Sequence, residues 1–291
     1  MPEGDTIFRT ATSLRRWLAG RQITSVRAPR VGFDTERLVG RTVETVEARG
    51  KHLLVRLDGG QVGGPLALHT HMGMTGSWHV YPAGERWRKP SRQATIMLGA
   101  GNRVAVCFNA PVVELLSRVD EAAHPSLARL GPDVLVPEVL DPVEVRRRGR
   151  ARAPASVTIG ELLLDQQVVS GIGNIYRCES LFLCGVHPAT PVGEVDGGQL
   201  DRLVETASSL MRANLGAGAG AGADTGPGAG ARAGVGGAGR RGPPWVYGRQ
   251  GRPCRRCGTL IRRQLLGVQP RPVYWCPGCQ PDRAGARPDF D

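Results

Sequence analysis

The spacing of hydrophobic and polar positions changes along the chain and divides it into regions of different secondary structure. From Asp5 to Leu18 apolar residues recur at helical spacing, and Gly20 follows, which predicts an amphipathic helix. Between Gln22 and Asn109 the pattern consists of short β-rich runs separated by Gly, Pro and Asp. These runs predict an antiparallel sandwich or barrel. The expected strands cover 23–28, 42–48, 52–57, 66–69, 94–98 and 104–108.

The pattern becomes helical after the tripeptide Gly131-Pro132-Asp133. Residues 158–169 carry an apolar cluster and are expected to be helical, and the glycine-rich turn 170–173 follows. A second helix is predicted to begin at Asn174, with Asn174 as its cap, and a third to cover about 199–215. This arrangement has helix–turn–helix character, and the exposed amides at the start of such a helix favour a phosphate.

The segment 216–242 is almost entirely Gly and Ala, so it can bury too little apolar surface to offset its ordering entropy. We predict that it is flexible, that a folded module resumes at about Pro243, and that a short polar tail ends the chain. The predicted divisions are 1–130, 131–215, 216–242, 243–281 and 282–291.

The composition indicates the kind of partner. The net charge is +12 although only 22% of the 291 residues are charged, which favours a polyanion such as nucleic acid over a membrane surface. No apolar run approaches the roughly 20 residues of a membrane span, and the N-terminus lacks a signal-peptide core, so a cytosolic protein is expected. The total of 7 cysteines is odd, which argues against a disulfide framework and for a metal site plus free thiols.

Four of these cysteines form two CxxC pairs near the end of the chain. Two such pairs across a short span are typical of a tetrahedral structural zinc site, and four sulfur ligands leave no open position for water. A pair of redox-active dithiols is the less fitting alternative. The residues between the pairs can supply a β-hairpin, 259–264 with 273–275. The predicted ligands are Cys254, Cys257, Cys276 and Cys279.

Cations accompany this predicted hairpin. Arg262, Arg263 and Arg271 lie between the two cysteine pairs, and Arg255 and Arg256 lie within the first pair. A solvated basic face is one interpretation. In a basic protein with a metal-bound hairpin, contact with phosphates is favoured.

The start of the chain carries candidate chemistry. If Met1 is removed, Pro2 has a free secondary amine next to the carboxylate of Glu3. An α-amino group has a pKa of about 8, so near neutral pH a useful fraction can act as a nucleophile on an electrophilic sugar carbon and form an iminium. Glu3 is then placed to move the protons that this step requires. An ordinary N-terminus before a helix is the simpler interpretation of this motif alone.

Other side chains also have a simple structural interpretation. His69 and His71 are more readily alternating strand residues than metal ligands, because no third ligand is evident nearby in the sequence. Asp165 and Glu179 are expected to be helix-surface or capping residues. Met74, in a glycine-flanked loop, is either a wedge between bases or a core methionine.

The chain carries, in order, the motifs Pro2-Glu3-Gly4, Arg49-Gly50-Lys51, His71-Met72-Gly73-Met74-Thr75-Gly76, Gly131-Pro132-Asp133, Leu164-Asp165-Gln166, 171–176 and the four cysteines. Taken together, these motifs resemble the Fpg/Nei family of DNA glycosylases, and more closely its endonuclease VIII branch. The resemblance covers nearly the whole chain except the Gly/Ala-rich segment and the tail. It implies an α+β protein with an N-terminal antiparallel β-sandwich flanked by helices, then a helix–two-turn–helix bundle and a zinc-finger β-hairpin with one structural Zn²⁺.

The resemblance also implies roles for single residues. Pro2 matches the nucleophile that attacks C1′ of the damaged nucleotide, and Glu3 the residue that protonates the sugar oxygen. Lys51 matches a catalytic-site lysine on the phosphate backbone. Asn174 and Arg271 match the residues that clamp phosphates around the lesion. The residue that fills the gap left by the flipped base corresponds to Met74.

The implied activity is excision of an oxidised base followed by β,δ-elimination, which leaves a one-nucleotide gap with phosphates on both ends. Asp5-Thr6 stand where the family often has a second carboxylate at position 6. The loop 108–112 lacks the arginine that faces the opposite base in the Fpg branch, which favours oxidised pyrimidines. The Gly/Ala-rich segment stands where members of the family have a more polar connection that approaches the DNA.

Two alternatives differ in class: a non-catalytic protein of this fold that binds lesions or abasic sites, and a sequence-specific regulator. The joint presence of Pro2, Glu3 and Lys51 argues against the first, and the β-rich half against the second. The expected protein is a bacterial, cytoplasmic monomer, associated with the nucleoid through damaged DNA and not with membranes.

Overall fold

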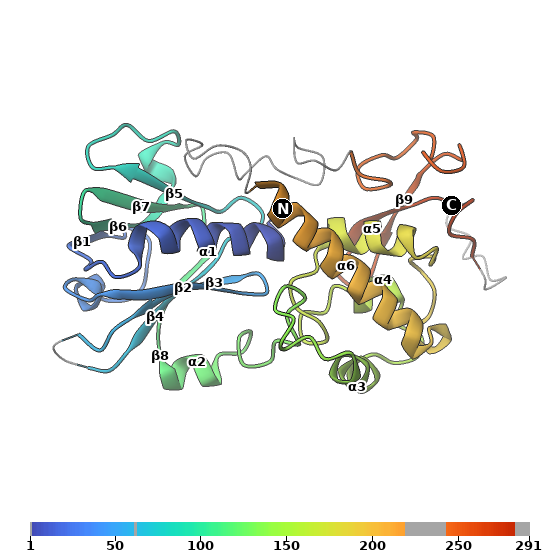
Figure 1. Ribbon diagram of the computed structural model, residues 1–291, viewed down its shortest axis with the longest axis horizontal. Helices are drawn as coiled ribbons and strands as arrows, with labels where there is room; N and C mark the ends of the chain where they lie inside the picture. Colours follow the sequence, from blue (N-terminus) through green and yellow to red (C-terminus); the bar gives the residue numbers. More distant parts are fainter. Residues whose placement is uncertain (1, 61–62, 219–242, 283–291) are drawn as a thin grey trace. The chain divides into compact units, whose positions relative to one another are not determined.

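The computed structural model describes residues 2–60, 63–218 and 243–282, which form two compact units (Figure 1). The described residues up to Arg129 make the first unit, and those from Leu130 onward make the second. The first contains antiparallel sheets and the second is mainly helical, so the predicted α+β class is confirmed. No helix within the described ranges is long and apolar enough to cross a membrane.

The first unit contains a sandwich of two four-stranded antiparallel sheets, as predicted, and not a closed barrel. The first sheet has the order β1 (Ser25–Arg27), β6 (Ala94–Ala100), β7 (Arg103–Phe108) and β5 (Ser77–Pro82). The second sheet has the order β2 (Val43–Arg49), β3 (His52–Leu57), β4 (Leu66–His71) and β8 (Val112–Ser117).

Helix α1 (Gly4–Leu18) closes the core of this unit. Its apolar stripe, Ile7, Ala11, Leu14 and Leu18, is buried, and it joins one hydrophobic cluster with side chains from both sheets. The period of the apolar residues in the sequence therefore identified the face that packs. Glu3 is the N-cap residue of α1, and its carbonyl accepts the backbone N–H groups of Thr6 and Ile7.

The outer face of the second sheet is polar and is partly covered by α2 (Arg118–Ala123). Side chains alternate between the two faces of a strand, so in β3 the residues Leu53, Val55 and Leu57 enter the core and His52 and Arg56 point the other way. A capping box between Ser117 and Asp120 starts α2 directly after β8.

The second unit consists of α3 (Pro142–Arg152), α4 (Ile159–Leu162), α5 (Asn174–Leu183), α6 (Gly197–Gly218) and a hairpin of β9 (Arg262–Leu266) and β10 (Arg271–Trp275). Helix α5 contacts α4, α6 and β10. It shares a buried apolar cluster with the hairpin module, to which Cys178, Phe182, Val246, Val273 and Trp275 belong.

Several local predictions were wrong. The helix expected over 158–169 is only the short α4, which ends at Leu162 because the next N–H groups, of Leu164 and Asp165, donate to carbonyls three residues earlier. A further turn follows, in which the side chain of Asp165 accepts the backbone N–H of Gln167. Helices α2 and α3 and the strands β5 and β8 were not predicted. Helix α6 continues past Leu215 to Gly218; the rest of the predicted flexible segment, 219–242, and the tail beyond Asp282 lie outside the described residues.

Side chains and tight backbone contacts hold the turn between α4 and α5. The amide of Gln166 donates to the carbonyls of Leu164 (2.8 Å) and Ile172 (3.0 Å) and accepts the backbone N–H of Gly171 (3.0 Å). Gly131 packs against this turn, and a Cβ on Gly131 would lie 2.4 Å from the carbonyl oxygen of Val168. Residues of the Gly-Pro-Asp motif and of the Asp-Gln motif therefore stabilise this turn.

We expect Gly131→Ala to lower the free energy of unfolding of the second unit by about 1–3 kcal/mol, because the new methyl group meets backbone that cannot rotate away. Urea unfolding of the full chain measures the change. Gly216→Ala is the matched control: Gly216 is an exposed helical glycine in the same unit with nothing within 4 Å of an added Cβ, so its effect should be below about 1 kcal/mol and stabilising. Equal stability of the two variants would contradict this account of Gly131.

Candidate active site and DNA-contacting surfaces

The register of the second sheet brings three connections to one edge of the first unit. Arg49 pairs with His52, His52 with His71, and His71 with Val112. The β2–β3 turn, the loop after β4 and the loop before β8 therefore lie at the same edge. Lys51 is in the two-residue turn between β2 and β3, where Gly50 has a φ of 58°, a conformation that favours glycine.

The start of α1 lies toward the same end of the first unit in the view of Figure 1. Pro2 is half-buried, and Glu3 beside it is only 1% exposed. Asp5, in the first turn of α1, is also buried and forms an ion pair with Arg9 at 3.6 Å. Two carboxylates thus stand within the first residues of the chain, next to a helix N-terminus whose dipole favours negative charge.

The loop after β4 presents one methionine to solvent and buries another. Met72 is 2% exposed and belongs to the core, whereas Met74 is 73% exposed. The loop is closed by a hydrogen bond of 2.8 Å from the backbone N–H of Gly76 to the carbonyl of Met72. It lies against the loop before β8, because a Cβ on Gly73 would be 2.9 Å from Cγ of Pro111. Met74 is therefore a surface residue and not the core methionine that the sequence also allowed.

In the second unit, the start of α5 and the start of β10 lie together. The side-chain amide of Asn174 donates to the carbonyl of Pro272 at 2.8 Å, which places Asn174 next to Arg271. Arg177, fully buried, donates to the same carbonyl at 3.1 Å and to the side-chain oxygen of Asn174. The expected role of Asn174 as helix cap is wrong: Gly173 is the N-cap residue, and the Asn174 side chain is directed to the hairpin instead.

The three hairpin arginines are exposed but do not form one cluster. Arg271 pairs with Leu266 at one end of the hairpin, and Arg262 pairs with Trp275 at the other. Arg263 points to the opposite face, because neighbouring strand residues alternate. Of these arginines, Arg271 is the one that the register places beside Asn174.

The four predicted cysteine ligands converge. The sulfur atoms of Cys254, Cys257, Cys276 and Cys279 all lie within 4.8 Å of one another, and this cluster could bind a metal ion. Hydrogen bonds with Thr259 lower the pKa of the Cys257 thiol to about 6, whereas burial raises that of Cys276 and, to about 12, that of Cys279. A cation would favour the thiolate form of all four sulfurs.

Sequence reasoning missed several buried polar residues. Glu179, expected on a helix surface or as a cap, is 2% exposed, and its carboxylate accepts the backbone N–H groups of residues 245–247 at 2.8–3.0 Å. Arg177 was not singled out at all. Asp165 caps the turn after α4, in line with one of its two interpretations. The spacing of the residues in the sequence does not reveal the contacts of Glu179 and Arg177, because both bind backbone groups more than 60 positions away along the chain.

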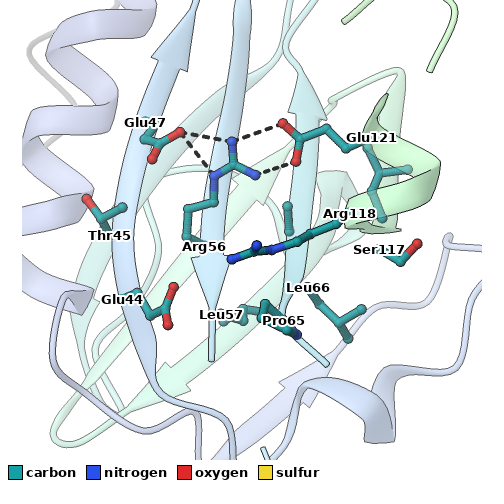
Figure 2. Close-up of a pocket in the computed structure, with 12 residues that line it drawn as sticks. Glu44, Thr45, Glu47, Arg56, Leu57, Pro65, Leu66, Ser117, Arg118 and Glu121 are labelled. Carbon is teal, nitrogen blue, oxygen red and sulfur yellow. Dashed lines mark hydrogen bonds and ion pairs between the residues drawn. The ribbon is translucent and has the colours of Figure 1, made fainter. Parts of the chain in front are cut away.

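A cavity of about 350 Å³ lies on the outer face of the second sheet (Figure 2). Its lining residues belong to the strand ends that are remote from the turn with Lys51. Arg56 lies between Glu47 and Glu121 in its wall, hydrogen-bonded to both. The charge of Arg56 is thereby paired with two carboxylates. The cavity is separate from the edge that carries the candidate active-site residues.

Comparison with known proteins identifies the family of the chain. Residues 1–111 match the formamidopyrimidine-DNA glycosylase N-terminal domain, and residues 130–224 match the H2TH domain of the same glycosylases. The chain is 40% identical to "Probable endonuclease 8 2" of Streptomyces coelicolor, with 99% of each chain covered. It is 35% identical to "DNA-(apurinic or apyrimidinic site) lyase Nei2" of Mycolicibacterium smegmatis, with 96% of this chain and 99% of that protein covered.

Among solved structures, a complex of Lactococcus lactis Fpg with DNA containing an abasic site has the same fold. The TM-score is 0.78 at 22% sequence identity, over 97% of this chain and 100% of that one. Because the domain matches, the identities over nearly the full length and the fold agree, this chain belongs to the Fpg/Nei family and is a member of its endonuclease VIII-like branch.

Proposed function

We propose that this protein is a DNA glycosylase with abasic-site lyase activity that acts in base excision repair. The observation that carries the proposal is the start of the first unit, where a half-buried Pro2 adjoins the buried carboxylate of Glu3. Full-length relatives named as endonuclease 8 and as an abasic-site lyase support it.

The proposed chemistry begins with removal of Met1. The nitrogen of Pro2 forms a bond to C1′ of the damaged nucleotide, the bond between C1′ and the base breaks, and the base leaves with the proton that the Pro2 nitrogen releases. Glu3 donates a proton to the ring oxygen O4′, so the sugar opens and an iminium joins Pro2 to C1′. Loss of the 3′ phosphate and then of the 5′ phosphate by β- and δ-elimination gives a one-nucleotide gap.

Binding of the kinked DNA backbone is assigned to the cations and donors described above. Lys51 would contact the phosphate backbone from the edge of the first unit, and Arg271 from the hairpin. Asn174 donates one of its two amide hydrogens to Pro272, which leaves the other for a phosphate oxygen. Arg262 and Arg263 would add contacts with less precise geometry.

The exposed Met74 would fill the space left by the extruded base, since an enzyme that acts on a base must take it out of the duplex. The adjoining loop before β8 carries no arginine to face the opposite base. We therefore propose oxidised pyrimidines as the preferred substrates. We also propose damaged DNA as the partner and a monomer as the active form.

The metal of the four-cysteine cluster is proposed to be a single Zn²⁺ with a structural role. Four thiolates satisfy tetrahedral coordination, so the ion would hold the hairpin that carries Arg271 and would not take part in the reaction. The packing of Cys276 with Val273 and Trp275 against α5 supports this role, because it makes the metal cluster part of the core of the module.

Covalent trapping tests the proposed nucleophile. Incubation with abasic-site DNA and borohydride should give a covalent adduct in the wild type, and we expect Pro2→Gly to lower its rate of formation at least about a hundredfold. Pro29→Gly replaces an exposed proline of the same unit and should leave the rate unchanged. An undiminished adduct in Pro2→Gly would contradict the role of Pro2. A wild-type protein that binds this DNA but never forms an adduct would indicate the binding-only alternative.

Metal analysis tests the zinc site. The purified protein should contain about one zinc per chain, and Cys257→Ser should lose it together with the thermal stability of the second unit. Cys184→Ser is the control, because Cys184 lies outside the cluster and its contacts with Arg202 and Thr206 can be made by a hydroxyl group. Stoichiometric zinc in Cys257→Ser, or none in the wild type, would refute the assignment.

A further inference from the structure

Side-chain contacts hold the hairpin turn with Lys51 on both sides, at the end of β2 and at the start of β3. Arg49 and His52 form the residue pair that closes the turn, and because they are directly opposite each other their side chains point to the same face. That face is the polar outer face of the second sheet, which α2 partly covers. Each of the two residues is bound there by a different set of contacts.

The first attachment is an ion pair with α2. One terminal nitrogen of Arg49 donates to the carboxylate of Glu121 at 2.8 Å, and the other is 3.4 Å from the carbonyl of Leu127. The side chain of Glu121 is only 14% exposed. Its carboxylate also accepts hydrogen bonds from Arg56, which lower the pKa of Glu121 and keep it charged (Figure 2). Glu47 binds Arg56 from the other side.

The second attachment is a row of histidines. The Nδ1 atom of His52 is 2.9 Å from Nε2 of His69, and Nδ1 of His69 is 2.9 Å from the carboxylate of Glu114. The same oxygen of Glu114 is 3.0 Å from Nε2 of His124. Four of the 6 histidines of the chain, His52, His69, His71 and His124, have ring centroids 4.9–5.1 Å from their neighbours in this row.

The hydrogen bonds determine the tautomers. Nδ1 of His124 accepts the backbone N–H groups of Ser126 and Leu127, both at 3.2 Å, so the ring proton is on Nε2 and is donated to Glu114. His69 donates its Nδ1 proton to Glu114 as well, and its Nε2 therefore accepts from His52. Burial lowers the pKa of His69 and, to about 3, that of His52, which agrees with neutral rings.

This assignment argues against a metal site. The nitrogen atoms of His69 and His124 and an oxygen of Glu114 lie within 4.8 Å of one another, as ligands of one ion would. A cation would need a lone pair on Nε2 of His124. The two backbone N–H groups occupy the lone pair of Nδ1, however, so the ring proton must be on Nε2, and that atom has no lone pair to offer. The cluster is instead a network in which each proton has an acceptor.

We propose that Glu121 is a positioning residue for the lyase reaction: through Arg49 it holds the β2–β3 turn so that Lys51 stays at the phosphate backbone, and the His52–His69–Glu114 network holds the other strand of the turn. The inference rests on the role of Lys51 under the proposed function. A displacement of the order of 1 Å at a group that contacts the substrate can cost about a hundredfold in rate, so a two-residue turn with one cation needs support on both strands.

A double-mutant cycle tests whether Glu121 acts through Lys51. The single-turnover rate of adduct formation with abasic-site DNA and borohydride is measured for the wild type, Glu121→Gln, Lys51→Ala and the double variant. We expect Glu121→Gln to lower the rate about tenfold when Lys51 is present and less than about twofold when it is absent, because residues that act as a unit are not additive. His52→Phe should show the same dependence on Lys51.

Glu47→Gln is the matched control. Glu47 binds Arg56, as Glu121 does, but lies on the other side of it, and its variant should keep the wild-type rate. Thermal unfolding of every variant separates a loss of folding from a loss of positioning; if Glu121→Gln does not fold, Arg49→Gln removes the same contact and leaves Glu121 paired with Arg56.

The outcomes separate this inference from the proposed function. If Lys51→Ala alone reacts at the wild-type rate, the role of Lys51 is wrong and the inference fails with it. If Lys51→Ala is slow but Glu121→Gln is fast, or is slowed equally with and without Lys51, the proposed function stands and the positioning role of Glu121 is refuted.

Discussion

The antiparallel register of the second sheet is the constraint on which the candidate active site depends. Arg49, His52, His71 and Val112 are successive partners across four strands, so the three connections beyond them must lie at one edge. A shift of one residue in any of these pairs would turn the side chains of that strand to the other face and expose part of the core. The burial of the inner face therefore also sets the place of Lys51 and of the Met74 loop.

The two faces of this sheet have different roles because strand side chains alternate. The inner face supplies apolar residues to the core that α1 completes. The outer face carries the charged and imidazole groups that bind α2 and the segment after it. Buried polar groups of this kind must find partners to offset their lost hydration, and the partners of Arg49 and His52 also hold the turn that carries Lys51.

In the second unit, side-chain hydrogen bonds to the backbone hold the candidate site residues in place. Gln166 holds the turn before α5, Asn174 and Arg177 bind the carbonyl of Pro272, and Glu179 accepts three backbone N–H groups of the hairpin module. These contacts connect α5 to the hairpin and so bring Arg271 to the helix start. The phosphate-binding surface that we propose therefore lies within one unit.

The sequence by itself determined the α+β class, the α1 helix, most strands of the sandwich, the four cysteines and the family, because apolar periodicity and motif spacing are local properties of the chain. It did not predict β5, β8, α2 or α3, and it misplaced the end of α4 and the side chain of Asn174. Only the tertiary structure brought Glu114 and His124 to His69, and Glu121 to Arg49. The physical reason is that these contacts join residues up to 72 positions apart, across a strand register and a helix position that packing of the whole unit decides.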